Sequence, residues 1–265
     1  MEYLGSLGRL TGLPCHSEER VQPAARYITE TTVEGRRRAQ VRPVTPRSWD
    51  VVWDLSEPTE IAALTGFISG AWGRGPWVWV PVQAQVGNLL TPRESMLVDR
   101  ASVSTEHIQD AGPVRDASGG WSARSVTVTI TSGWVALARD VPVIAGKPVT
   151  FSADVEGSGP EVYVVFYDAA GGQMSTNAAA GSGADMQRVS VTATAPAGSV
   201  SANIGLRSTV TRAARPQVTW TAGPVPWSAG QGCRSAIVDG FTEDLLVANR
   251  FGPYSQVGFT VMEVS

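Results

Sequence analysis

Short runs of alternating apolar and polar residues, separated by clusters of glycine and proline, constrain the fold of this chain more than any other feature. A period of two places side chains on opposite faces of a β-strand, and Gly and Pro mark the turns between strands. The 265 residues include 28 glycines and 17 prolines, yet 43% are hydrophobic, enough to fill a core. This composition excludes disorder and collagen-like structure. We therefore expect a mainly all-β protein.

The N-terminal block, residues 1–87, follows the period of two except in one segment. Residues 25–44 are expected to form a hairpin, and residues 48–55 a strand with one apolar face. In residues 56–71 the apolar spacing becomes i, i+3, i+4, which predicts a single amphipathic α-helix. Residues 77–82 then return to the alternation of a strand.

The middle block, residues 88–227, is rich in Ser, Thr, Val, Ala and Gly. Strands are expected at 125–131, 149–155, 162–167, 188–193, 201–206 and 217–221. Their regular spacing is typical of a β-sandwich or jelly roll. The small residues at 178–183 predict a surface loop.

The C-terminal block, residues 228–265, contains three more expected strands, at 235–238, 243–248 and 257–263. Three strands seldom form a domain alone, so we expect them to complete the sheet begun by the N-terminal block. The chain then divides into a discontinuous β-domain with one helix, formed by 1–87 and 228–265, and an inserted jelly-roll domain, 88–227.

Three segments of the N-terminal half resemble the opening of minor tail proteins from tailed phages of actinobacteria: 47–53 (RSWDVVW), 75–81 (GPWVWVP) and 88–92 (NLLTP). The discontinuous organisation is similar to that of distal tail proteins of long-tailed phages. This resemblance implies a virion structural protein of the distal tail or baseplate hub, assembled in the host cytoplasm. It also implies a homo-oligomeric ring, a hexamer by expectation, that joins the tail tube to tail-tip and baseplate proteins.

The middle block is similar to jelly-roll carbohydrate-binding modules. The resemblance is carried by 145–153 (AGKPVTFSA), 164–171 (VVFYDAAG), 188–198 (RVSVTATAPAG) and 216–220 (PQVTW). It implies a host-glycan-binding module displayed on the tail, although the same sandwich also serves as a structural appendage. Two alternative functions follow, a host-surface adhesin at the tail periphery and a glycan-degrading tail enzyme.

Sugar binding needs an aromatic ring stacked on a pyranose and planar hydrogen-bonding side chains around it. In the strand expected at 162–167, Tyr163 and Tyr167 share the side that is expected to face solvent. The full candidate set is Tyr163, Tyr167, Trp121, Trp134, Asp168, Gln173 and Asn177. The alternative is that these aromatic residues fill the sandwich or touch a neighbouring subunit.

Seven residues of the N-terminal block are candidates for a subunit interface: Trp49, Trp53, Trp77, Trp79, Arg36, Arg37 and Arg38. Aromatic residues and Arg are enriched at interfaces. The alternating tryptophans fit either a core or subunit packing, and the arginines fit either a solvated turn or salt bridges to a neighbouring subunit or tube protein.

Composition and motifs argue against several other functions. A net charge of −3 disfavours nucleic-acid binding, and the longest apolar run, 77–86, is too short for a membrane helix and contains Pro81. Residues 1–20 lack the pattern of a secretory signal. Neither histidine lies in a catalytic motif, and two cysteines form no metal or disulfide framework. We expect no enzyme activity, cofactor or metal.

Overall fold

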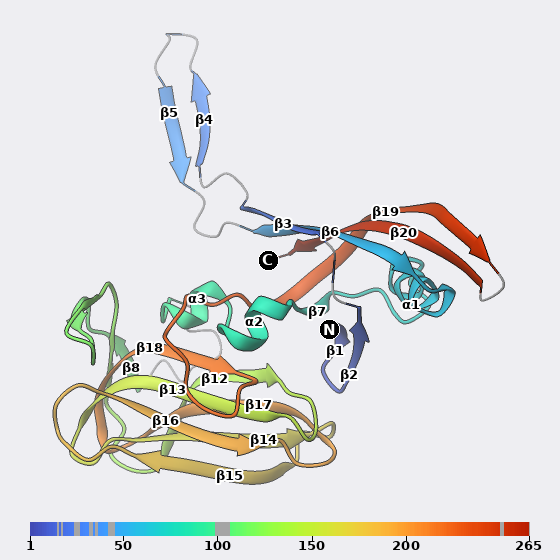
Figure 1. Ribbon diagram of the computed structural model, residues 1–265. Coiled ribbons are helices and arrows are strands. Elements are labelled where there is room, and N and C mark those ends of the chain that lie inside the picture. Colours follow the sequence, from blue (N-terminus) through green and yellow to red (C-terminus); the bar gives the residue numbers. More distant parts are fainter. Residues whose placement is uncertain are drawn as a thin grey trace. The chain divides into compact units, whose positions relative to one another are not determined.

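The fold is seen in a computed structural model, which describes residues 1–14, 16, 18–23, 27–31, 34, 37–41, 46–98, 107–249 and 252–264 (Figure 1). The chain forms two compact units. The first comprises Met1–Gly5, Thr11–Trp79 and Arg234–Ser265, and the second Ser6–Leu10 and Val80–Cys233. Strands dominate both units, as the sequence predicts, and no described helix is long and apolar enough to cross a membrane.

The first unit is built on a seven-stranded sheet with strand order β2-β1-β7-β19-β20-β6-β3. The strands are β1 (Glu2–Ser6), β2 (Arg9–Leu13), β3 (Glu18–Pro23), β6 (Arg47–Ser56), β7 (Trp77–Val80), β19 (Cys233–Asn249) and β20 (Gly252–Glu263). Strand β20 pairs antiparallel with both β6 and β19. The C-terminal strands therefore join the sheet of the N-terminal block, as expected, although the first two expected strands are one long strand, β19.

The expected helix is α1 (Pro58–Ile68). It begins two residues inside the predicted range 56–71, because Ser56 ends β6 and Glu57 is the N-cap. The backbone N–H of Glu57 donates to Glu60 Oε2 at 2.9 Å, which supplies the capping contact. Phe67 is buried and packs edge-on against Trp77, with ring centroids 5.1 Å apart. This contact turns the apolar side of α1 inward.

The four tryptophans proposed for a subunit interface are buried inside the chain. Trp49, Trp53, Trp77 and Trp79 are between 0% and 8% exposed. Trp53 packs edge-on against Phe259 of β20, with ring centroids 4.8 Å apart. These side chains belong to the core, the first of the two alternatives that their alternation allowed, and they leave little surface for another subunit.

The expected N-terminal hairpin is present as β4 (Tyr27–Thr31) and β5 (Arg37–Val41), which pair antiparallel. Arg37 and Arg38 begin β5, opposite residues 31 and 30 of β4. Arg36 lies outside the described residues, and the interface role of these three arginines stays a prediction.

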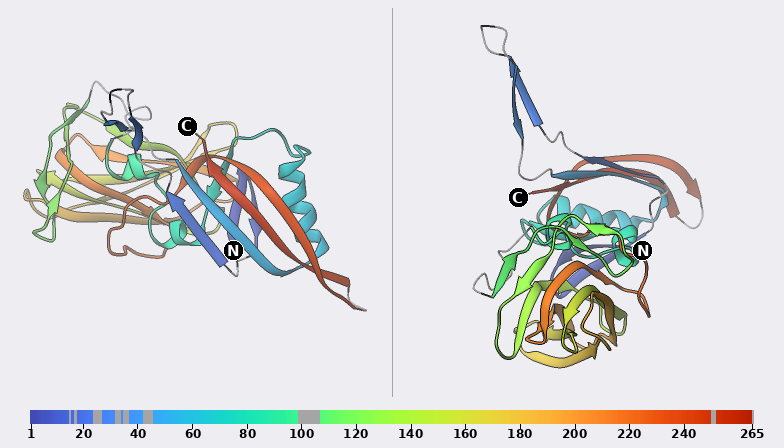
Figure 2. Two further views of the ribbon diagram at one scale, coloured as in Figure 1. Left: turned by 90° about the horizontal axis from the view of Figure 1, so that it is seen from above. Right: turned by 90° about the vertical axis from the view of Figure 1, so that its left-hand side faces the viewer.

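The second unit is a two-layer antiparallel β-sandwich (Figure 2). One layer has the order β16-β13-β18-β11-β8 and the other β12-β17-β14-β15, and a small separate sheet pairs β9 with β10. The strands are β8 (Ile108–Asp110), β9 (Val114–Arg115), β10 (Trp121–Ser122), β11 (Val126–Val128), β12 (Trp134–Pro142), β13 (Pro148–Gly157), β14 (Glu161–Asp168), β15 (Gln173–Ala180), β16 (Gln187–Thr194), β17 (Ser199–Arg207) and β18 (Val210–Thr219). The expected sandwich is therefore confirmed.

The core of the sandwich comes from alternate residues of the facing strands. Phe151 of β13, Phe166 of β14 and Ile204 of β17 are all fully buried. Val162 and Val164 share the inward side of β14 with Phe166, as the period of two predicts.

Two expectations about this unit are wrong. The loop expected at 178–183 is in part the end of β15, because Ala178–Ala180 pair with β14. Small residues such as alanine have little preference for strands, so the strand conformation of this segment is recognised only from its pairing with β14. The chain also forms two short helices that were not expected, α2 (Val82–Val86) and α3 (Pro92–Ser95).

Candidate functional site

The outer side of the four-stranded layer carries a row of aromatic side chains. Tyr163, Val165 and Tyr167 point outward from β14, because the residues between them fill the core. Strand β17 places Gly205 opposite Tyr163, and β12 places Trp134 opposite Arg207. The two neighbouring strands thus bring Trp134 to the same side as the tyrosines.

Gly205 makes room for the ring of Tyr163. A Cβ atom on Gly205 would lie 2.5 Å from Tyr163 Oη and would also collide with the carbonyl oxygen of Val135. The Tyr163 ring therefore crosses β17 at this glycine and meets Trp134 edge-on, with ring centroids 4.4 Å apart and planes at 67°. Tyr163 is only 5% exposed whereas Trp134 is 41% exposed, so Tyr163 supports an indole that faces solvent.

An ion pair borders this indole. Arg207 Nη1 donates to Glu161 Oε2 at 2.7 Å, and the Arg207 Cζ atom lies 5.4 Å from the centroid of the Trp134 ring. Arg207 is about half exposed, so the pair adds little to stability. Its effect is to hold a planar guanidinium and a carboxylate beside the exposed ring.

Further polar groups lie along the same side. Gln173, opposite Tyr167, donates from Nε2 to Thr176 Oγ1 at 3.0 Å. Asn203, opposite Val165, accepts at Oδ1 from the backbone N–H of Asp140 at 3.0 Å. We call Trp134, Tyr163, Tyr167, Gln173, Asn203, Arg207 and Glu161 the aromatic face.

The two tyrosine hydroxyls of the aromatic face make no hydrogen bond with the described part of the chain. Burial raises the pKa of Tyr163 far above its usual range, and the neighbouring Tyr167 raises it further, against a smaller lowering by Arg139. The Tyr163 hydroxyl is therefore neutral at physiological pH and can both donate and accept a hydrogen bond.

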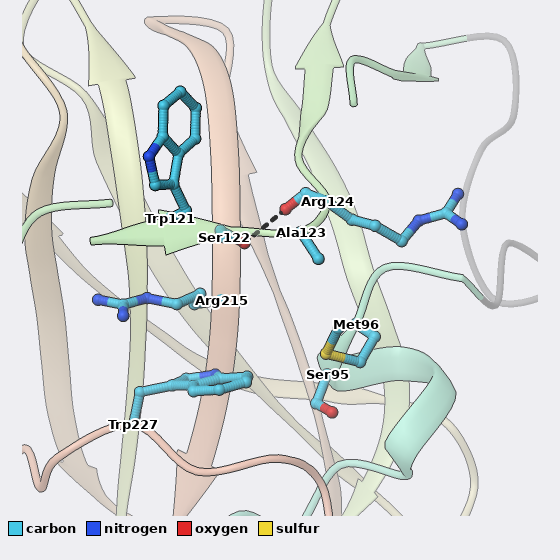
Figure 3. Close-up of a pocket in the computed structure, with 8 residues that line it drawn as sticks. All are labelled: Ser95, Met96, Trp121, Ser122, Ala123, Arg124, Arg215 and Trp227. Carbon is cyan, nitrogen blue, oxygen red and sulfur yellow. Dashed lines mark hydrogen bonds between the residues drawn. The ribbon is translucent and has the colours of Figure 1, made fainter. Parts of the chain in front are cut away.

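Four of the seven residues predicted for sugar binding meet on this face: Tyr163, Tyr167, Trp134 and Gln173. The other three do not. Asp168 closes a turn, with Oδ1 accepting from the N–H groups of Ala170 and Gly172 at 2.9 and 2.7 Å. Asn177 lies opposite Val164, on the inner side of β15. Trp121 lies in β10, beside a separate cavity (Figure 3).

Sequence reasoning missed Gly205, Arg207, Glu161 and Asn203. Arg207 and Trp134 are cross-strand partners, and no sequence signal predicts the register between β12 and β17 that pairs them. The role of Gly205 has no sequence signal, because it depends on the register between β14 and β17.

The outer side of the five-stranded layer is different, because it carries a buried ionic cluster. Asp154 is fully buried and accepts from Arg188 Nη1 at 3.0 Å and from Arg215 Nε at 2.7 Å. Arg215 Nη1 also donates to Asp116 Oδ2 at 2.7 Å. We call Asp154, Asp116, Arg188 and Arg215 the ionic cluster.

The cluster is satisfied by further hydrogen bonds. The side chain of Ser118 donates to Asp116 and is the main reason that the Asp116 pKa lies below its usual value, with Arg215 also lowering it. Burial lowers the pKa of Arg188, opposed by Asp154. Arg188 Nη2 donates to Ser152 Oγ and Gln217 Oε1, each at 2.8 Å. The arrangement is that of a structural network.

Within the described residues, no group of three or more His, Cys, Asp or Glu side chains is placed to hold a metal ion. Cys233 is buried, and Cys15 lies outside the described residues.

No protein-family model matches the sequence, and no curated protein matches it. Among solved structures, a Clostridium thermocellum endo-1,4-β-D-xylanase 10B fragment with CBM22-1 and GH10 modules, complexed with xylohexaose, matches at a TM-score of 0.32 and 14% identity. That match covers 45% of this chain and 26% of that chain, so this chain spans about a quarter of its length.

A structure of carbohydrate-binding modules from the β-sandwich superfamily matches at a TM-score of 0.29 and 12% identity, over 78% of this chain and 93% of that chain. At these scores and identities, neither similarity indicates a shared function.

Proposed function

We propose that the second unit binds carbohydrate on the aromatic face. The observation that carries the proposal is the exposed Trp134 indole, held edge-on by Tyr163 and bordered by the Arg207–Glu161 pair. A pyranose presents a face of C–H groups that packs on an aromatic ring, and its hydroxyls need planar donors and acceptors at the ring edge.

The polar groups around Trp134 suit such a ligand. Arg207 offers several N–H donors in one plane, Glu161 offers acceptors, and the Tyr163 and Tyr167 hydroxyls lack partners in the described chain. The face is a sheet surface, not a deep pocket, so it suits the side of an oligosaccharide. Single contacts of this kind are weak, and several copies on one particle would raise the avidity.

The test measures binding of the purified chain to an array of bacterial cell-wall and capsular glycans. Trp134→Ala is expected to lower affinity by about 2- to 12-fold, the equivalent of ~0.5–1.5 kcal/mol of aromatic packing. Val21→Ala is the control, because Val21 is a 49% exposed apolar residue of the first unit that belongs to neither proposed surface. Equal glycan binding by the wild type and Trp134→Ala would contradict the proposal.

We also propose that the first unit assembles with other copies of this chain, and one observation favours it. Leu245 and Leu246 of β19 are 64% and 49% exposed. Strand β6 ends at Ser56, which pairs with Ser255 of β20, and Leu245 of β19 pairs with the same Ser255. Beyond this point the hairpin β19–β20 has no third strand beside it among the described residues. The same hairpin and α1 also form a groove, whose lining includes Trp72, Ile61, Ala62, Glu243 and Pro253.

Exposed apolar side chains beside a groove are typical of protein interfaces. This assembly agrees with the resemblance of the N-terminal half to phage tail proteins, in which case the partners are tail-tube and tail-tip proteins and the location is the distal tail of a virion. The alternative is an adhesin at the tail periphery.

Light scattering after size-exclusion chromatography tests the assembly. The wild type is expected to form a defined oligomer, and Leu245→Glu with Leu246→Glu is expected to shift it towards monomer. Trp134→Ala, in the other unit, is expected to leave the mass unchanged. A wild type that stays monomeric at every concentration, and a double variant that keeps the oligomer, would each contradict the proposal.

A further inference from the structure

A second candidate site is a cavity of about 230 Å³ in the second unit, formed by residues that are not part of the aromatic face. Its walls include Met96, Trp121, Ser122, Arg124, Arg215 and Trp227. Trp121 and Trp227 lie at opposite ends, with Arg215 between them and Met96 to one side (Figure 3).

Separate segments of the chain meet at this cavity. Trp121 and Ser122 form β10, paired with β9, and Met96 follows α3. Arg215 lies within β18 with a φ of 49°, and Trp227 lies in the segment after β18. The Arg215 guanidinium lies 5.8 Å from the Trp227 ring centroid, so the ionic cluster positions one wall.

The charges that line the cavity are compensated. Arg215 donates to Asp154 and Asp116, each at 2.7 Å, and Arg124 pairs with Asp110. Neither arginine wall therefore offers an uncompensated charge to an anionic ligand. The cavity favours a neutral molecule.

Two N–H donors of the walls lack acceptors. Trp227 Nε1 and Arg124 Nε are buried and make no hydrogen bond with the described residues. A buried donor without an acceptor is unfavourable, and a ligand oxygen would relieve it.

The size and the aromatic walls narrow the choice of ligand. The volume is below the roughly 300–1,000 Å³ of pockets for drug-sized molecules, so a single ring fits better than a chain of rings. Two indoles and Met96 offer apolar contact to C–H groups, while the donors require oxygen acceptors. We propose that this cavity binds one neutral pyranose, such as the end residue of a glycan.

This inference extends carbohydrate binding to a second site and does not depend on the aromatic face. The test follows the tryptophan indole N–H signals by ¹H–¹⁵N NMR during titration with methyl glycosides of glucose, galactose, mannose and xylose. Methyl glucuronide is the anionic comparison. Trp121→Phe and Trp227→Phe assign the two signals.

At least one neutral glycoside is expected to shift the Trp121 and Trp227 signals saturably, while methyl glucuronide does not. Trp121→Ala is expected to weaken this binding by about 2- to 12-fold, since one stacking surface is lost. Trp121 is 69% exposed, so the substitution does not disturb the core. Trp134→Ala is expected to leave the two shifts unchanged, which separates this site from the aromatic face.

Three results would overturn the inference. They are the absence of a saturable shift with all four neutral glycosides, unchanged affinity in Trp121→Ala, and loss of the shifts in Trp134→Ala. If no glycoside binds in the cavity while binding to the glycan array still depends on Trp134, the aromatic face is the only one of the two proposed sites that binds sugar. If the array shows no dependence on Trp134 but the indole shifts occur, the cavity is the sugar site.

Discussion

On both layers of the sandwich, every second residue of a strand points to the outer side. The two outer sides differ in whether their polar side chains have partners within the chain. On the five-stranded layer, Asp154 is fully buried between two arginines, and the polar groups satisfy one another. On the four-stranded layer, Trp134 is 41% exposed and the Tyr163 and Tyr167 hydroxyls have no partner in the described chain. Polar groups that are already paired add to stability, whereas groups left without partners are available to a ligand.

The ionic cluster and the aromatic face are also expected to respond differently to the loss of one side chain. Breaking a buried ion pair leaves a charge without compensation, so the cluster cannot lose a member at low cost. Removal of an exposed aromatic ring takes away a contact surface for a ligand and leaves no buried charge behind. The largest stability effect is therefore expected on the five-stranded layer, and the effects on binding are expected on the four-stranded layer.

The largest effect is expected for Asp154→Asn. It removes the carboxylate charge that faces Arg188 and Arg215, and it is expected to lower the free energy of unfolding by about 3–5 kcal/mol. Urea denaturation measures the change. Asp185→Asn is the control, because Asp185 is exposed and is expected to change stability by less than about 0.5 kcal/mol. Equal stability of both variants would contradict a structural role for the cluster.

A smaller effect is expected for Gly205→Ala. The new Cβ would collide with Val135 O and Tyr163 Oη, so overpacking is expected to cost about 1–3 kcal/mol. Displacement of Tyr163 is also expected to weaken glycan binding at Trp134. Gly223→Ala is the control, because nothing lies within 4 Å of its Cβ position. Normal stability and glycan affinity in Gly205→Ala would show that Tyr163 does not depend on this glycine.

The ionisation of Asp116 is expected to make the stability of the second unit depend on pH. The pKa of Asp116 in the folded chain lies below its usual value, mainly because Ser118 donates to it. Its ionised form therefore stabilises the fold above a pH of about 3.9, and this contribution is lost as the pH falls through the folded pKa. Ser118→Ala is expected to be less stable than the wild type by about 1 kcal/mol at neutral pH, with the difference shrinking in acid.

Thermal unfolding over a series of pH values measures this difference. Ser158→Ala, in an exposed turn, is expected to match the wild type at every pH. A difference between Ser118→Ala and the wild type that stays constant into acid would exclude the Asp116 ionisation as its cause.

The smallest effect on stability is expected for Tyr167→Phe. The Tyr167 hydroxyl has no partner in the described chain, so its removal is expected to change the free energy of unfolding by less than about 0.5 kcal/mol. Glycan affinity is expected to fall by about 2- to 12-fold, because a hydrogen bond contributes ~0.5–1.5 kcal/mol. Isothermal titration calorimetry with the glycan selected on the array measures it. Unchanged affinity would remove Tyr167 from the site.

The period of two was sufficient to divide β14 between core and surface. It placed Val162, Val164 and Phe166 on one side, where all three are fully buried, and Tyr163 and Tyr167 on the other. The expectation that Tyr163 faces solvent is wrong, because Trp134 packs against its ring and leaves it only 5% exposed. The period of two also failed next to that strand. Residues 178–180 were assigned to a loop, and Asn177 was grouped with the tyrosines although its register places it opposite Val164.

The errors have a common physical cause, because alternation describes one strand and says nothing about its neighbours. Trp121 and Trp134 were equal candidates in the sequence. Strand pairing put Trp134 opposite Arg207, whereas Trp121 lies opposite Arg115 and lines the cavity at the end away from Trp227 (Figure 3). Register between strands depends on contacts over the whole sheet.

The sequence by itself determined that the chain is built of short antiparallel strands with one principal helix, because the spacing of apolar residues is a local property of the chain. It also determined which side of β14 faces the core. Only the tertiary structure decided that Gly205 accommodates Tyr163 and that Asp154 is enclosed by Arg188 and Arg215. These contacts join residues far apart in the chain, and their geometry exists only after the strands have paired and the layers have packed.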